Sequence, residues 1–353
     1  MLQLRDRNIA EKLLEKIKKA NLKLKIMHVC GTHQDTIVKY GLDNLLRKIG
    51  IELIQGPGCP VCVTTSEEIS KAILLAEKGK TIATFGDMIK VPAGKKSLEK
   101  VRADGADVKI VYSIDDAIKM AKEKEIIFLG VGFETTAPST AVSLLKEPKN
   151  FSVLSFHRYI SPALDALLGM GEVKIDGIIC PGHVSTIIGM MPYEPIAKKY
   201  KIPHVIAGFE PLDVLMAVYM IVKQIEEGRY EVENEYIRCV KEEGNLKAKE
   251  VLKEVFEPAD AKWRGFPVIK QSKMKIKDKF EDFDADKIYE DLIEDMEVPP
   301  EPKGCRCGEV LRGLIYPQDC PLFGRICNPS NPVGPCMVSA EGACNIEYRY
   351  KND

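Results

Sequence analysis

The chain ends in a cysteine-rich segment, residues 301–353, that we call the tail. Between positions 305 and 344 it holds six of the chain's eleven cysteines, with five glycines, five prolines and few large apolar side chains. Such a segment buries too little apolar surface to offset the conformational entropy lost on ordering, so it needs cross-links or a metal. Its cysteines are Cys305, Cys307, Cys320, Cys327, Cys336 and Cys344. The tail therefore constrains the fold more than any other part of the sequence.

Four arrangements of these cysteines are open: a disulfide scaffold, a zinc site, an iron–sulfur cluster, or a mixture of free thiols. Disulfide scaffolds are typical of small secreted domains, and we recognise no secretory signal in this sequence of 353 residues. Structural zinc sites usually contain paired C-x2-4-C or H-x3-5-H ligands, and the tail has no histidine and no second such pair. Wide spacings with glycine and proline between thiolates favour a cubane cluster. We therefore expect an iron–sulfur domain, in which spacing alone does not choose the four ligands and two thiols remain as a redox pair.

The bulk composition excludes several classes of function. Hydrophobic residues make up 45% of the chain and charged residues 29%, which is typical of a soluble globular protein. The net charge is −1 and no lysine or arginine stripe alternates with aromatic residues, so we expect no nucleic-acid partner. No apolar run approaches the ~20 residues of a membrane-spanning helix. We expect a cytoplasmic protein, where thiols are reduced and clustered cysteines indicate metal binding or catalysis.

Ahead of the tail, short apolar strands alternate with helical segments. The strands are predicted at 24–29, 51–54, 81–85, 108–112, 126–131, 152–156, 175–179 and 205–207. Such alternation predicts parallel βαβ units. The tripeptide GFE and a strand running into Pro-Gly each occur twice, which indicates two α/β domains of similar plan. We predict α/β domain I over 1–125, α/β domain II over 126–230, a helical and charged connecting segment over 231–300, and a Cys-rich iron–sulfur domain over 301–353.

Reactive side chains gather directly after the predicted strands. In open α/β sheets, ligands bind beyond the carboxyl ends of the strands, where loops are exposed but held by a rigid sheet. The residues at these positions are Cys30, His33, Cys59, Cys62, Glu134, His157, Cys180, His183 and Glu210. A buried packing role is the simpler interpretation of Cys180. The sequence does not assign individual roles to Glu134, His157, His183 and Glu210.

The sequence Cys59-Pro-Val-Cys62 places two thiols three positions apart before a predicted helix. The positive end of a helix lowers a thiol pKa and favours the nucleophilic thiolate. This spacing suits reversible disulfide formation or a soft metal. We predict that the pair cycles between dithiol and disulfide, whereas full burial would argue for a packing role.

The sequence Cys30-Gly-Thr-His33-Gln places a thiol and an imidazole on one loop. As a nucleophile and its base they would need a third, orienting group, and none is identifiable. As soft ligands for iron they are chemically natural. A phosphate-binding loop is disfavoured because the chain has no GxxxxGK[ST] motif. Cys30 and His33 are therefore candidate soft ligands for iron, and the residues alone do not settle their roles.

Taken together, five motifs resemble those of the HypD family of [NiFe] hydrogenase maturation proteins, along the whole chain. The matching stretches are CGTHQ (30–34), GPGCPVC (56–62), GFETTAP (132–138), CPGHVS (180–185) and the tail over 304–344. The resemblance implies a scaffold on which an iron carrying cyanide and carbon monoxide is assembled, with Cys30 as an iron ligand. It also implies a hetero-complex with the small chaperone HypC, which contributes an N-terminal cysteine to the iron, and with the cyanide carrier HypE. This chain would be a monomer within that complex.

The resemblance further implies different roles for the cysteines. The family's cluster motif, C-x14-C-x6-C-x16-C, falls on Cys305, Cys320, Cys327 and Cys344, the implied ligands of a [4Fe–4S] cluster. That leaves Cys307 and Cys336 as a redox pair, and Cys59 and Cys62 as a second pair nearer the iron. Electrons would pass from the cluster through both pairs to the iron at Cys30, since thiol pairs carry two electrons at a time.

Two functional hypotheses stay open. The first is an assembly scaffold with thiol redox activity. The second is a stand-alone [4Fe–4S] dithiol/disulfide oxidoreductase without substrate iron. Cys30 and His33 distinguish them, because a pure dithiol reductase has no use for a third reactive site.

Overall fold

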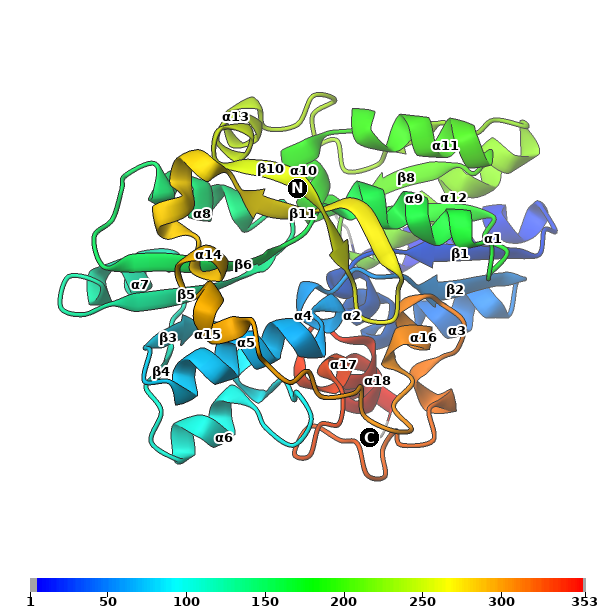
Figure 1. Cartoon of the computed structure of the whole chain (residues 1–353). Coiled ribbons are helices and arrows are strands. Elements are labelled where there is room, and N and C mark those ends of the chain that lie inside the picture. The colour runs from blue at the N-terminus through cyan, green and yellow to red at the C-terminus, as the bar shows by residue number, and fades with distance from the viewer. Residues whose placement is uncertain (1–4, 352–353) are drawn as a thin grey trace.

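The computed structural model describes residues 5–351 and contains two parallel β-sheets with helices on their faces (Figure 1). Sheet A has the strand order β2-β1-β7-β8-β9, with β1 Leu24–His28, β2 Ile51–Gln55, β7 Gly177–Pro181, β8 His204–Ala207 and β9 Val232–Asn234. Sheet B has the order β4-β3-β5-β6, with β3 Ile82–Thr84, β4 Val108–Ile110, β5 Ile126–Gly132 and β6 Phe151–His157. Every strand pair in both sheets is parallel. The predicted α/β class with parallel sheets is confirmed.

The chain visits the two sheets in a different order from the predicted division at residue 125. It forms β1 and β2 of sheet A, then all of sheet B, and returns to sheet A at β7. Sheet A is therefore built from residues 24–55 and 177–234, and sheet B from residues 82–157. The local strand pattern predicts where strands lie, but not which distant strands pair.

Helices connect the strands and cover the sheets. They are α1 Arg7–Lys19, α2 Gly31–Lys39, α3 Leu42–Arg47, α4 Pro60–Val63, α5 Ser66–Glu77, α6 Leu98–Ala103, α7 Ile114–Met120, α8 Ala137–Leu144, α9 Ile160–Met170, α10 Gly182–Ile188, α11 Glu194–Tyr200, α12 Pro211–Glu226, α13 Leu246–Val255, α14 Ala285–Ile288 and α15 Glu290–Ile293. Short 3₁₀ turns lie at Met88–Lys90, Met191–Tyr193, Asp278–Phe283 and Pro317–Asp319. Helix α5 begins at a capping box: Thr65 Oγ1 accepts from Glu68 N at 3.3 Å, and Glu68 Oε2 accepts from Thr65 N at 3.0 Å.

The core has three parts, and alternate side chains of β5 contribute to two of them. All of β5 is buried, as expected for a parallel strand covered on both faces. Ile126 and Phe128 pack toward α7, α8 and the hairpin described below, whereas Ile127 and Leu129 face a central core shared with sheet A and the tail. A third cluster fills the face of sheet A under α1, α2, α3 and α12. The central core therefore joins both sheets to the tail.

Residues 231–300 differ from the predicted helical connecting segment. They contain α13 but also an antiparallel hairpin, β10 Phe256–Lys262 and β11 Val268–Ile276. Along β11, Ile269, Met274 and Ile276 are buried while the intervening lysines face outward, a strand pattern that the high charge concealed. The tip of the hairpin reaches the tail, since a Cβ at Gly265 would lie 2.2 Å from Cα of Gly308.

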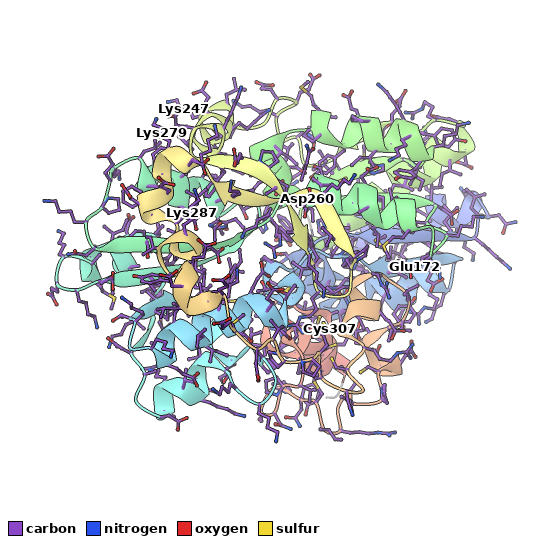
Figure 2. All side chains as sticks on the ribbon, viewed as in Figure 1. Glu172, Lys247, Asp260, Lys279, Lys287 and Cys307 are labelled. Carbon is purple, nitrogen blue, oxygen red and sulfur yellow. A yellow bond between two sulfur atoms is a disulfide. The ribbon has the colours of Figure 1, made fainter. Side chains whose placement is uncertain are left out.

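The tail folds into short helices joined by turns, α16 Cys307–Leu311, α17 Pro335–Val338 and α18 Ala343–Lys351. In Figure 1 it lies beneath α2, α3 and α4, and α16 and α17 pack against α4 while α18 packs against α2. Figure 2 shows Lys247, Lys279 and Lys287 at the outer surface and Cys307 inside, where it is 5% exposed. None of the helices within residues 5–351 is long and apolar enough to cross a membrane.

Candidate functional site

The carboxyl ends of strands from both sheets open onto one pocket of about 360 Å³. This explains why the reactive residues of the sequence follow strands: two parallel sheets direct their carboxyl edges at the same space. The lining comes from the loops after β1, β2, β3, β5 and β7, and from one residue of the tail. The polar and reactive residues among it are Cys30, Asp87, Thr135, Thr136, His183 and Glu341.

Cys30 lies at the start of α2 and is 7% exposed. Burial raises the pKa of its thiol to about 11, although hydrogen bonds from the backbone of His33 and Thr32 oppose the rise. Here burial outweighs the helix start, which by itself favours a thiolate. The thiol is therefore protonated near neutral pH, and a bound metal cation would displace its proton.

His33 is on the same helix as Cys30 but does not line the pocket. Its Nε2 lies 2.9 Å from the carbonyl oxygen of Gly208 and 3.2 Å from that of Ala207, and its ring packs 5.0 Å from the ring of Phe209. Burial lowers the pKa of His33 to about 4, so the ring is neutral and Nε2–H donates to these carbonyls. The imidazole at the pocket is instead His183, whose ring stacks on Phe209 at 3.9 Å. The predicted iron-binding role of His33 has no support from this geometry.

Two carboxylates that the sequence analysis missed also line the pocket. Asp87 Oδ2 accepts from Ser339 Oγ at 3.2 Å and from Ala340 N at 3.3 Å, which fixes the tail segment at the pocket. The neighbouring Glu341 keeps an exposed surface at the pocket, but the desolvation of its carboxylate by the surrounding protein, followed by the charge of Asp87, raises its pKa. The tail and the start of α2 lie in close contact here: a Cβ at Gly31 would lie 2.5 Å from both Cβ and O of Glu341. Asp87 follows β3 and obeys the strand-end rule, whereas no sequence signal points to Glu341.

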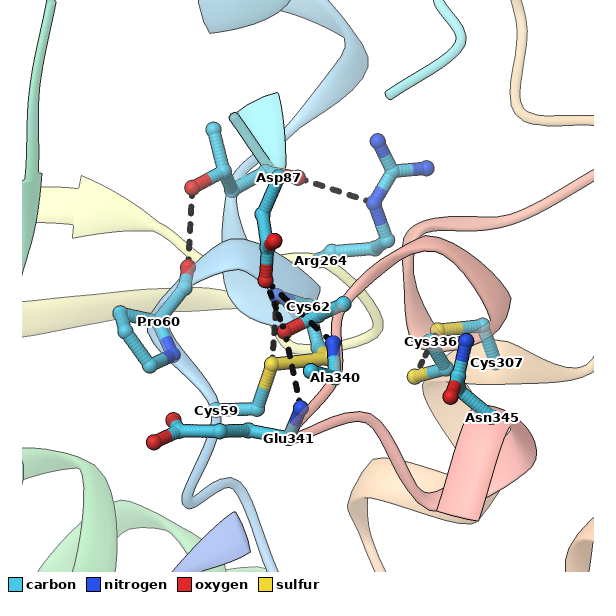
Figure 3. Close-up of a disulfide and its surroundings, with 12 residues drawn as sticks. Cys59, Pro60, Cys62, Asp87, Arg264, Cys307, Cys336, Ala340, Glu341 and Asn345 are labelled. Atoms are coloured by element: carbon cyan, nitrogen blue, oxygen red, sulfur yellow. Dashed lines mark hydrogen bonds between the residues drawn. A yellow bond between two sulfur atoms is a disulfide. The ribbon is translucent and has the colours of Figure 1, made fainter. Parts of the chain in front are cut away.

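Cys59 and Cys62 form a disulfide that spans the short helix α4 (Figure 3). Both residues are fully buried, and Cys59 Sγ accepts a hydrogen bond from Cys62 N at 3.2 Å. Burial hinders direct exchange with external thiols, which agrees with the packing alternative, but it does not separate the pair from the tail helices that pack against α4. Pro60 and Val61 separate the disulfide from the solvent of the pocket, and α17, which carries Cys336, packs against α4. The cysteines nearest to this disulfide along the packed helices are therefore those of the tail.

Cys307 and Cys336 place their Sγ atoms 2.7 Å apart in the buried part of the tail. The hydrogen bond from Cys336, with a contribution from the charge of Arg264, lowers the pKa of Cys307, and the same bond raises that of Cys336. Arg264 comes from the hairpin tip, where its Nε donates to Thr64 O at 2.9 Å and its guanidinium pairs with Glu301. The hairpin that the sequence analysis missed thus supplies a buried cation to this thiol pair. Its predicted redox role stays a prediction.

All six tail cysteines line one small cavity of about 10 Å³. The other lining side chains are apolar, so the donor set is sulfur alone, which suits iron–sulfur chemistry. Burial and then the neighbouring thiols Cys307, Cys320 and Cys344 raise the pKa of Cys305, because buried thiolates oppose one another's ionisation. A cationic iron core would relieve that opposition, so the donor set fits a cluster. In the part of the chain that is described, no group of three or more His, Cys, Asp or Glu is placed to hold a metal ion.

The other strand-end residues stay outside the pocket. Cys180 is fully buried within β7. His157 Nε2 lies 3.0 Å from Thr140 Oγ1, and Glu210 caps α12 and pairs with Arg5 at 2.6 Å. Glu134 Oε1 accepts from the backbone of the α9 start at 3.1 Å, and burial raises the Glu134 pKa to about 7. Of the candidates from the sequence, the structure brings Cys30 and His183 together at the pocket.

Fold and site together define a cysteine-rich α/β protein in which strand ends of two parallel sheets border a pocket, beside a tail whose six cysteines line a separate cavity. The model of the HypD family, described as "Hydrogenase formation hypA family", matches residues 7–351. The chain belongs to this family.

Relatives of the chain carry hydrogenase-related names. A protein of Methanocaldococcus jannaschii, provisionally named a hydrogenase expression/formation protein, is 50% identical over 99% of both chains. Hydrogenase maturation factor HypD of Cupriavidus necator is 41% identical over 99% of this chain and 96% of its own. Hydrogenase maturation factor HypD of Escherichia coli is 42% identical over 93% of this chain and 89% of its own. These findings support a role in hydrogenase maturation.

Proposed function

We propose that the chain is a scaffold and electron-relay protein for assembly of the Fe(CN)2CO moiety of the [NiFe] hydrogenase active site. The observation that carries this proposal is the pocket itself, where Cys30 lines a space bordered by the loop of the Cys59–Cys62 disulfide and by the tail. Cys30 supplies one soft protein ligand to the substrate iron. One thiolate leaves coordination positions for cyanide, carbon monoxide and a ligand from a partner.

The tail would hold a [4Fe–4S] cluster through Cys305, Cys320, Cys327 and Cys344, and when bound the cluster supplies single electrons. The chain's own thiols then handle electron pairs. The thiolate of Cys307, the member with the lowered pKa, attacks the disulfide of Cys59 and Cys62. Cys336 resolves the mixed disulfide, so that one pair is oxidised to a disulfide while the other becomes a dithiol. The packing of α16 and α17 against α4 supports this order.

The proposed partners are those that the family resemblance implies. A small chaperone of the HypC type would place its cysteine against the iron as the second thiolate, and a carrier of the HypE type would then deliver cyanide. The exposed His183 marks the side of the pocket that solvent and a partner reach. We infer a single copy of this chain within that hetero-complex.

Infrared spectroscopy of anaerobically copurified protein tests the iron site. The expected result is metal-bound CN and CO bands in the wild type and their loss in Cys30→Ala, together with weaker association with the small chaperone. The matched control is Cys239→Ala, which removes an exposed cysteine far along the chain and should keep the bands. Full-strength bands in Cys30→Ala would place the iron elsewhere. A wild type that reduces external disulfides but never acquires the bands would be the stand-alone oxidoreductase instead.

Iron and sulfide analysis tests the tail. Anaerobic protein should contain about four iron and four sulfide per chain for the cluster. Alanine variants of the four proposed ligands should lose the cluster absorbance, and Cys307→Ala or Cys336→Ala should keep it. Stoichiometric zinc without sulfide would exclude the cluster, and loss of absorbance in Cys307→Ala would show that the ligand set is wrong.

A further inference from the structure

A buried chain of hydrogen bonds joins the helix that begins at Cys30 to the tail. Gln34 lies in α2, where its backbone N–H donates to the carbonyl oxygen of Cys30 at 3.2 Å. Its side chain is 7% exposed, and its Nε2 donates to Oε1 of Glu347 at 3.1 Å. Glu347 belongs to α18, the tail helix that packs against α2. Gln34 therefore contacts both the backbone of Cys30 and a side chain of the tail.

The other end of the Gln34 amide is fixed by strand β1. Oε1 of Gln34 lies 2.7 Å from Nε2 of His28. Because the carboxylate of Glu347 accepts, Nε2 of Gln34 donates to it, and Oε1 accepts from His28. His28 and Glu347 are 1% and 3% exposed. Hydrogen bonds to a charged group away from water are among the strong ones, so this amide has one defined position.

Glu347 also contacts the two tail segments that carry proposed cluster ligands. It lies one turn after Cys344 in α18, and its Oε2 accepts from Nε2 of Gln318, which directly precedes Asp319 and Cys320. A cluster bound by Cys320 and Cys344 would fix these segments relative to one another. It would thereby also fix Glu347, which bonds to one segment and belongs to the other.

We propose that Gln34 and Glu347 are positioning residues for the iron ligand. They hold the start of α2, and with it Cys30, in the place from which Cys30 binds the substrate iron, and they make that place depend on an assembled tail. This inference rests on the proposed role of Cys30. The position of α2 is nevertheless measurable in protein without substrate iron.

Two other contacts of the tail provide comparisons. Arg349 Nη2 lies 3.3 Å from Oδ1 of Asp35 in α2, but these side chains are 40% and 33% exposed, so water screens the pair. Tyr316 Oη donates to Glu52 Oε1 at 2.7 Å, in strand β2. Tyr316→Phe is therefore the matched control, because it removes one hydrogen bond between the tail and sheet A without changing a contact of α2.

Exchanging the two side chains tests the proposal. Gln34→Glu places two carboxylates against each other. The double variant Gln34→Glu/Glu347→Gln restores the contact with donor and acceptor exchanged. Its carboxylate at position 34 accepts from His28 and from the amide at position 347, and the oxygen of that amide still accepts from Gln318.

The measurement is the rate at which iodoacetamide labels Cys30 in the anaerobic full chain, with exposed Cys239 as reference and amide hydrogen exchange of α2 alongside. A buried thiol reacts through local opening, and the lost hydrogen bond should raise the open population, so we expect labelling about tenfold faster in Gln34→Glu. The double variant and Tyr316→Phe should stay within about twofold of the wild type. An unchanged rate in Gln34→Glu, no recovery in the double variant, or equal acceleration in Tyr316→Phe would overturn the proposal. If Gln34→Glu does not fold, Gln34→Met, which removes both hydrogen bonds without adding charge, decides in the same way.

A second comparison tests the dependence on the tail. Cys344→Ala, which should lose the cluster, should also accelerate labelling of Cys30. Adding Gln34→Met to Cys344→Ala should then change the rate little, because the two substitutions interrupt the same chain of contacts. Effects that simply multiply would show that the tail does not act through Gln34.

Infrared spectra separate this inference from the proposed function. Gln34→Glu should keep about four iron and four sulfide per chain but lose most of the intensity of the CN and CO bands, and the double variant should regain it. Full-strength bands in Gln34→Glu would overturn the positioning role and leave the proposed function intact. Absence of the bands from the wild type would refute the iron site itself, and the labelling rates would still decide whether these residues position Cys30.

Discussion

The ion pair between Arg158 and Glu68 connects α5 to the end of β6 almost out of contact with water. The two side chains are 1% and 12% exposed, and Nε and Nη1 of Arg158 have no hydrogen-bond partner among residues 5–351. Removing the carboxylate leaves a buried guanidinium uncompensated, and breaking a buried pair from one side costs about 3–5 kcal/mol. We predict that Glu68→Gln lowers the free energy of unfolding by about 3 kcal/mol through the loss of this ion pair. The loss stays at the lower end of the range because glutamine still completes the capping box at the start of α5.

Helix α5 provides its own control for this measurement. Glu77 pairs with Lys96 at 2.5 Å, but their side chains are 35% and 58% exposed, so Glu77→Gln should cost less than about 1 kcal/mol. Urea unfolding followed by far-ultraviolet circular dichroism, in one fixed thiol state, gives both values. The double variant Glu68→Gln/Arg158→Met should recover much of the loss, since an apolar replacement of a buried pair is often neutral. Equal costs for the two glutamine variants would refute the burial argument.

Three further predictions concern the pocket and its surroundings. Burial raises the pKa of Glu134 to about 7 from its usual 4.5, so the folded state holds this proton more tightly than the unfolded chain; the stability that this provides is full below pH 4.5 and is lost as the pH rises through 7. Relative to the wild type, the free energy of unfolding of Glu134→Gln, measured with urea, should therefore rise by about 3 kcal/mol between pH 4.5 and pH 8. An unchanged difference between the two proteins over this range would contradict the burial of the carboxylate. With a pKa of about 11 instead of 9.0, Cys30 in the metal-free protein should react with iodoacetamide at pH 8 about 100-fold more slowly than an unperturbed thiol. Peptide mass spectrometry with exposed Cys239 as reference should show the Cys30 rate still rising above pH 9, and a plateau there would disprove the raised pKa. Gly31→Ala should cost about 1–3 kcal/mol and speed proteolysis of the tail, because the new methyl group would lie 2.5 Å from Glu341; an unchanged cleavage rate would mean that the tail yields without cost.

The sequence pattern predicts the local parts of this fold well. Every predicted strand is present, because parallel strands buried on both faces appear as short apolar runs. Cys30 and His183 lie at the pocket because the carboxyl ends of parallel strands share one edge. The capping box at Thr65 is a local feature of the same kind, since it depends on residues three positions apart.

The parts that could not be predicted depend on contacts between distant residues. The pairing of β1 with β7 joins segments that no local pattern connects. Glu341 reaches the pocket only because the tail turns back against Gly31. His33 has the residue type of a ligand, but its ring nitrogen is used by the carbonyl oxygen of Gly208, and that use depends on how the loop after β8 is placed. The hairpin over 256–276 was hidden because three lysines lie between the buried residues of β11, so the segment has the composition of a charged linker.

The split of sheet A between two stretches of chain has a consequence for protein synthesis. β2 ends at Gln55 and its sheet is continued only at Gly177, about 120 residues later. At roughly 5–20 residues per second, the ribosome needs on the order of ten seconds to supply the missing strands. During that interval the nascent chain exposes β1, which will become an interior strand, along one whole unpaired edge. Nascent chains stalled between residues 60 and 170 should therefore be the ones that bind ribosome-associated chaperones most strongly.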